Sequence, residues 1–138
     1  MKIYATAYAV TLIVFVVVDF VWLSVMADRL YRPVMGDMLA TKFRLAPAIV
    51  FYLLFIAGMT FLAVRPGLLA QSVWVGLIHG AVLGFTAYAT YDLTSQAVLK
   101  NWSTALTVAD LIWGTFVSAV AAGAGTWVTL FVKTRSGG

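Results

Sequence analysis

Two aspartates, Asp19 and Asp110, interrupt long apolar runs of the sequence, and each is followed three residues later by a tryptophan, Trp22 or Trp113. An ionised aspartate at the centre of a membrane helix costs about 2.5–3.5 kcal/mol on insertion scales. Such a residue is therefore expected to be paired, protonated or turned toward a polar interior. Intramembrane carboxyl groups commonly bind cations or carry protons, so the repeated Asp-x-x-Trp pattern is the first candidate for a binding site.

A third carboxyl group, that of Asp92, is predicted to lie near the other two. Asp19 stands about eight residues before its apolar run ends, and Asp110 stands soon after the start of the fourth run. Asp92 and its neighbour Tyr91 stand where the third run ends. At a rise of 1.5 Å per residue, all three carboxyl groups fall within roughly 12 Å of one membrane face. We therefore expect one site there.

The aspartates have structural interpretations as well as functional ones. Asp19 and Asp110 are expected to share a proton, because neighbouring carboxylates in a low dielectric do not both ionise cheaply. The alternative is that each bonds across helices to a hydroxyl or amide while its tryptophan anchors the membrane interface. For Asp92 the alternative is an Asx turn or an N-cap at a helix end.

His79 is the one histidine of the chain and lies near the middle of the third apolar run. A neutral imidazole bonded across the bundle is the structural interpretation, and a binding contact or proton relay is the functional one. One histidine with distant aspartates is a poor ligand set, so we predict no metal and no cofactor. The absence of cysteine excludes disulfides and thiolate chemistry.

The elements that must position these residues are membrane helices. The chain has 138 residues, of which 63% are hydrophobic and 10% are charged, against roughly 25% charged residues in soluble domains. Each of its four apolar runs is long enough to cross a hydrocarbon layer of about 30 Å. We predict an all-α membrane protein, a four-transmembrane-helix bundle forming one domain over residues 1–138, with helices at about 3–27, 45–64, 70–91 and 105–132.

The connections carry most of the charge. The net charge of +4 comes from basic residues that flank the apolar runs, so we interpret them as headgroup anchors and predict no nucleic-acid partner. Because these residues stand on both sides, they do not determine the orientation. The first run is longer than a signal-peptide core and is expected to be retained. We expect an interfacial segment at 28–44, a tight turn at 65–67 and surface turns at 93–103 anchored by Trp102.

Small residues predict which helices touch. Residues with minimal side chains recur every four positions in the third and fourth runs, which lets another backbone approach closely. The first, third and fourth helices are therefore expected to share the polar interior, with the second at the periphery. The same ridges could join copies of the chain in a homo-oligomer. The ridge residues are Gly76, Gly80 and Gly84 in the third run and Gly114, Ser118 and Ala122 in the fourth.

These motifs together resemble a family of small predicted bacterial membrane proteins, catalogued as domain of unknown function 2177. The resemblance covers nearly the whole chain, although Ser95 stands where the family has asparagine. It implies a multi-pass protein of the bacterial inner membrane and no assigned activity. The segments that carry it are Asp19-Phe20-Val21-Trp22-Leu23, His79-Gly80-Ala81, Ala87 to Thr94, Trp102, and Asp110-Leu111-Ile112-Trp113-Gly114.

Three functions are compatible with this pattern. The favoured one is binding or transport of a small cation, a proton or an amphiphile such as a lipid, in a cavity lined by the three aspartates together with Trp22, Tyr91 and Trp113. The second is a membrane-embedded, lipid-modifying enzyme with His79 as partner of an aspartate, although His79 is expected about 15 Å from Asp92 along the membrane normal. The third is a structural or accessory subunit of a membrane complex, with the lipid bilayer as the main partner.

Overall fold

The computed structural model describes residues 2–26 and 45–135, and this part of the chain is helical apart from short connections at 71–72 and 99–103. Four helical spans are long and apolar enough to cross a membrane, which confirms the predicted all-α four-helix architecture. The second span is built from three consecutive segments. The elements are α1 (Lys2–Met26), α3 (Leu45–Met59), the π-helix η3 (Thr60–Val64), α4 (Arg65–Ala70), α5 (Val73–Val98) and α6 (Thr104–Arg135).

The second span continues past the expected turn at 65–67. The Arg65 N–H donates to Thr60 O, five residues earlier, and this wider π-helical turn places Pro66 in the first turn of α4 without ending the span. The turn falls instead at Gln71, which adopts a left-handed conformation with φ 52°. Ser72 then caps α5, its Oγ accepting a hydrogen bond from Val75 N at 3.3 Å.

The third span also extends further than predicted. Helix α5 runs to Val98, so Asp92 lies inside a helix and its interpretation as an Asx turn or N-cap is wrong. The connection to α6 is correspondingly short. Trp102 in this connection is buried, and its Nε1 donates to Thr107 Oγ1 at 2.9 Å, so it anchors the connection to the bundle. The predicted interfacial segment at 28–44 lies outside the described residues.

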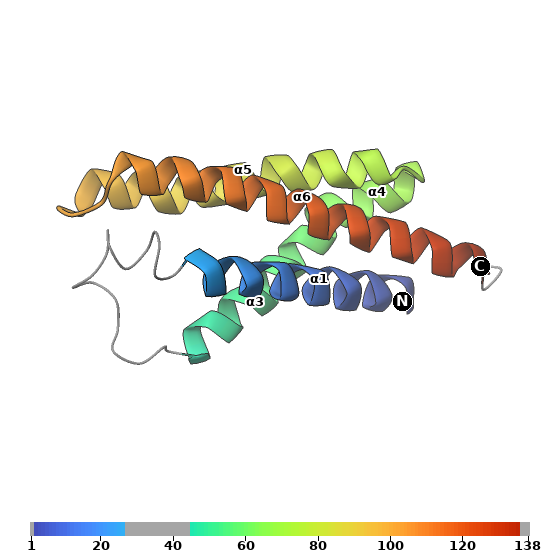
Figure 1. Ribbon diagram of the computed structural model, residues 1–138. Coiled ribbons are helices and arrows are strands. Elements are labelled where there is room, and N and C mark those ends of the chain that lie inside the picture. Colours follow the sequence, from blue (N-terminus) through green and yellow to red (C-terminus); the bar gives the residue numbers. More distant parts are fainter. Residues whose placement is uncertain (1, 27–44, 136–138) are drawn as a thin grey trace.

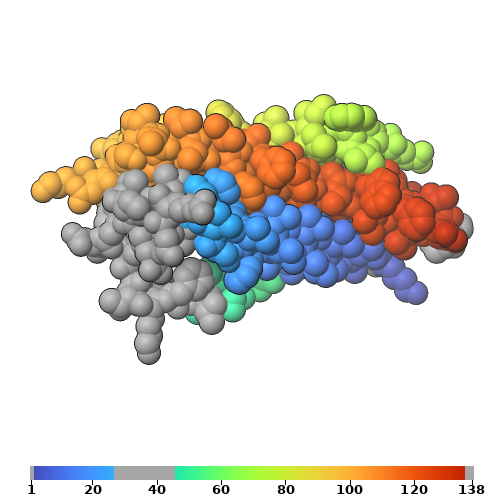
Figure 2. Space-filling model, viewed as in Figure 1, coloured from blue at the N-terminus to red at the C-terminus, as the bar shows by residue number. Residues whose placement is uncertain are grey.

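The helices are arranged around α6. Helices α5 and α6 run antiparallel and side by side, α1 lies along α6, and the second span crosses obliquely so that η3 and α4 pack against α5 (Figure 1). Figure 2 shows the contact of α1 with α6 along one face. The first residues of α1 and the last of α6 lie at the same end (Figure 1).

The prediction of a peripheral second helix is wrong for the second half of this span. Ile56, Met59 and Val64 are fully buried and pack with Phe15 and Val117 in the apolar core. The first part of the span is more exposed. The oblique crossing therefore gives one helix two roles: its second half closes the core, and its first half diverges from α5.

The small residues of α5 and α6 face each other, which confirms the predicted close approach. A Cβ atom placed on Gly80 would lie 2.6 Å from Ala122 Cβ and 2.7 Å from Ser118 O. A Cβ on Gly84 would collide with Gly114 and Ser118. Because the two ridges pack against each other within one chain, they are not exposed as the surface that was expected to join copies in a homo-oligomer.

The substitution Gly80→Ala should destabilise the bundle by about 1–3 kcal/mol, because the added methyl group meets backbone and side-chain atoms of α6. The matched control is Gly58→Ala, since a Cβ on Gly58 meets no atom within 4 Å. The control should be neutral or more stable by up to about 1 kcal/mol. Unfolding by sodium dodecyl sulfate in mixed micelles, followed by circular dichroism, measures both. Equal stabilities of the two variants would contradict the inferred contact.

Candidate functional site

Asp19 joins three helices through hydrogen bonds. Tyr52 Oη on α3 donates to Asp19 Oδ2 at 2.5 Å, and Trp113 Nε1 on α6 donates to Asp19 Oδ1 at 3.0 Å. Asp19 is only 8% exposed, so it is turned away from lipid as predicted. Both of its oxygens have neutral donors, and this arrangement satisfies a buried carboxyl group without a cation.

The two tryptophans of the repeated pattern meet. The rings of Trp22 and Trp113 stack with centroids 4.4 Å apart and an interplanar angle of 8°. The two tryptophans therefore form one aromatic contact between α1 and α6. The Asp-x-x-Trp motif of α1 contacts that of α6 in two ways: Asp19 accepts a hydrogen bond from Trp113, and Trp22 stacks on the Trp113 ring.

Asp92 and Asp110 form a carboxyl pair between α5 and α6. Asp92 is fully buried and Asp110 is 7% exposed. The two side chains are within hydrogen-bonding reach of each other, whereas no N–H or O–H donor among the described residues reaches either oxygen of Asp92. The expected carboxyl partner of Asp110 was Asp19. The pairing differs because α5 remains helical through Asp92 and brings it into the interface with α6.

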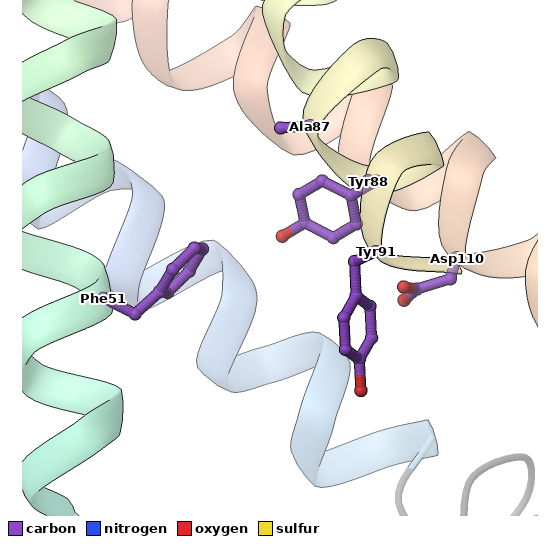
Figure 3. A pocket seen from close by; sticks show the side chains of 5 residues that line it. All are labelled: Phe51, Ala87, Tyr88, Tyr91 and Asp110. Carbon is purple, nitrogen blue, oxygen red and sulfur yellow. The ribbon is translucent and has the colours of Figure 1, made fainter. Parts of the chain in front are cut away.

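Asp110 forms part of the wall of a cavity that is lined mainly by aromatic side chains. The cavity has a volume of about 330 Å³ and is lined by Phe51 from α3, Ala87, Tyr88 and Tyr91 from α5, and Asp110 from α6. Figure 3 shows the Phe51 ring on one side of this space and the two tyrosines on the other, with the carboxyl group of Asp110 beyond Tyr91. Phenylalanine and tyrosine rings beside one carboxyl group attract organic cations.

Local packing explains how the tyrosines come to lie there. A Cβ on Gly114 would collide with the Tyr88 ring, so glycine at this position allows the ring to lie against the backbone of α6. The Tyr91 ring packs edge-on against Trp102, with centroids 5.6 Å apart. Trp102 is in turn fixed through Thr107, whose Oγ1 donates to Gln96 Oε1 at 2.7 Å.

His79 lies elsewhere. Its Nδ1 is 2.8 Å from Val75 O in the same helix, and because a carbonyl only accepts, Nδ1 is the nitrogen that donates. The imidazole is exposed and lines a different hollow, of about 360 Å³, between η3 and α5, together with Leu62 and Thr86. The predicted bond across the bundle is thus replaced by a bond within α5, and His79 does not join the aspartates.

The predicted site residues therefore separate into two groups and one outlier. Asp19, Trp22 and Trp113 form a junction of α1, α3 and α6, while Tyr91, Asp92 and Asp110 lie at the cavity or beside it. The two groups are neighbours, because Trp113 follows Asp110 by one helical turn. In the described residues no three potential ligands among His, Cys, Asp and Glu come together to hold a metal ion.

Sequence reasoning missed Phe51 and Tyr88 as cavity residues. Tyr88 had a usable signal, because it precedes Asp92 by four residues and so shares its helix face. Phe51 had none, since it is one apolar residue among many and only the oblique crossing of the second span brings it to the cavity.

Comparison with protein-family models assigns the chain. Residues 4–127 match the family described as Predicted membrane protein (DUF2177), and the protein belongs to that family. It is accordingly a multi-pass membrane protein, and the described residues include four helices that are each long and apolar enough to cross a membrane. No curated protein and no solved structure matched the chain.

The substitution Tyr52→Phe should lower stability by about 0.6 kcal/mol, and at most about 1.7 kcal/mol, the range measured for hydrogen bonds between membrane helices. It deprives Asp19 Oδ2 of the donor that the structure provides. The control Tyr4→Phe, on the exposed part of α1, should change stability less. In an Asp19→Ala background the effect of Tyr52→Phe should vanish, as measured by unfolding in mixed micelles. An unchanged effect in that background would mean that the hydroxyl stabilises the bundle by another route.

Proposed function

We propose that the protein binds or transports a small cation or a cationic amphiphile, or carries protons, through its intramembrane aspartates. The observation that carries the proposal is the position of Asp110 on the wall of the aromatic cavity, in hydrogen-bonding reach of the buried Asp92. A carboxyl group in this setting supplies charge, and the rings around it supply apolar and cation–π contact.

The route of entry favours an amphiphile. The cavity is lined by α3 on one side and by α5 and α6 on the other, and α3 diverges from α5 at this end of the bundle (Figure 1). A molecule dissolved in the bilayer could therefore reach Asp110 from the side, with its charged group at the carboxyl and its apolar part toward lipid.

The two alternative functions receive less support. A lipid-modifying enzyme that pairs His79 with an aspartate requires hydrogen-bond reach between them, and His79 instead lines a separate hollow. A purely structural role fits Asp19, whose two oxygens are both bonded to neighbouring helices. It does not account for Asp92, whose oxygens no N–H or O–H donor of the described residues reaches, or for the cavity beside its partner Asp110.

The proposed location is the inner membrane of a bacterium. Helical bundles are the architecture of that membrane, whereas bacterial outer-membrane proteins are typically barrels. Fractionation of the cell envelope, with the protein recovered in the inner-membrane fraction, would support this location, and recovery in the outer-membrane fraction would contradict it.

Binding is tested with dodecyltrimethylammonium, a monovalent cationic amphiphile, and protein in phosphatidylcholine nanodiscs, with protein-free nanodiscs as background. The substitution Asp110→Asn should weaken protein-dependent binding at least about tenfold, because it removes the charge and keeps the size. Binding measured with radiolabelled probe and by native mass spectrometry should agree.

Two controls separate charge recognition from general effects. Uncharged dodecanol should show no difference between the wild type and Asp110→Asn. His79→Gln, a polar substitution at the other hollow, should leave the cation affinity unchanged. A folded Asp110→Asn variant with wild-type affinity for the cation would overturn the proposed binding of cations at Asp110.

A further inference from the structure

The two carboxyl groups of the Asp92–Asp110 pair have different surroundings. Asp92 has no exposed surface, and neither of its oxygens receives a bond from an N–H or O–H donor of the described residues. Asp110 retains a small exposed fraction and lies on the cavity wall. Asp92 is thus the more deeply buried member of the pair, and Asp110 is the member that a ligand in the cavity can touch.

Two carboxyl groups in contact require a proton to bond to each other. Carboxylate oxygens are acceptors only, so a hydrogen bond between Asp92 and Asp110 needs one of them to be a carboxylic acid. The charged form is less costly where a cationic ligand can reach it, which is at Asp110 on the cavity wall. The proton belongs on the more deeply buried group.

We propose, building on the function proposed above, that Asp92 is a protonated positioning residue that donates its hydrogen bond to the carboxylate of Asp110. The pair then carries one negative charge, located at the cavity wall, and one monovalent cation neutralises it. The substrate class is accordingly a monovalent organic cation, and Asp92 acts through Asp110 without touching the ligand.

The other titratable groups at this place fit the assignment. Tyr91 interacts electrostatically with both aspartates, and Tyr88 lines the cavity beside Asp110. The phenols are neutral donors at ordinary pH and add no charge. Asp19 on α1 is occupied by Tyr52 and Trp113 and is a separate group.

The location of the proton is tested on ligand-free protein by infrared spectroscopy. The difference spectrum between the wild type and Asp92→Asn should contain the carbonyl band of a protonated carboxyl group at neutral pH. The band should persist when dodecyltrimethylammonium binds to the wild type. Its absence from the wild type, or its full retention in Asp92→Asn, would overturn the proposal whether or not the probe binds.

The unequal roles are tested by binding. Asp92→Asn replaces the O–H donor with an N–H donor and keeps the single charge on Asp110, so its affinity for the probe should stay within about threefold of the wild type. Asp110→Asn should lose at least about tenfold. Asp92→Thr, which offers a hydroxyl donor on another side chain, replaces Asp92→Asn if the latter does not fold, and should likewise retain binding.

The outcomes distinguish this inference from the function on which it rests. Loss of affinity in Asp92→Asn or Asp92→Thr as large as in Asp110→Asn, with wild-type binding intact, would mean that both carboxyl groups carry charge, and would overturn the inference alone. Failure of the wild type to bind the probe would overturn the proposed binding of organic cations and, with it, the assigned substrate class. Binding that saturates at one probe per protein supports the single charge, and saturation at two would contradict it.

Discussion

The close approach of α5 and α6 is the contact on which the other features of the bundle depend. At Gly80 and Gly84 the two helices lie so close together that no methyl group fits between them. Without a hydrophobic driving force between helices in lipid, such packing is a main source of association. The same approach brings Asp92 against Asp110 and lets the Tyr88 ring lie on Gly114. Packing and the candidate site therefore have one origin.

Polar side chains in this bundle are satisfied in two ways. Around Asp19, neutral donors on α3 and α6 take both carboxyl oxygens, and the stacked tryptophans cover the junction. At Asp92 the partner within reach is another carboxyl group. The first arrangement is complete within the protein. The Asp92–Asp110 pair, by contrast, can take up a proton or a cation. The proposed function therefore rests on Asp92 and Asp110 rather than on all three aspartates.

The second span links the core to the cavity. Its π-helical turn keeps Pro66 within a continuous span, and Ile56, Met59 and Val64 pack in the interior. Its first part diverges from α5, and Phe51 on that part forms one wall of the cavity. The same part carries Tyr52, whose Oη donates to Asp19 Oδ2.

The sequence by itself determined the class of protein, the four spans, the burial of Asp19 and Asp110 and the contact between the small-residue ridges. These follow from hydrophobic length, from the cost of charge in lipid and from side-chain size, which are all local properties. Only the tertiary structure decided which carboxyl groups pair, where the third helix ends and which residues line the cavity. The pairing of Asp110 with Asp92 depends on the register between α5 and α6, and the place of Phe51 depends on the crossing angle of the second span. The register and the crossing angle are both set by the packing of whole helices against one another. The spacing of residues along a single helix does not specify that packing.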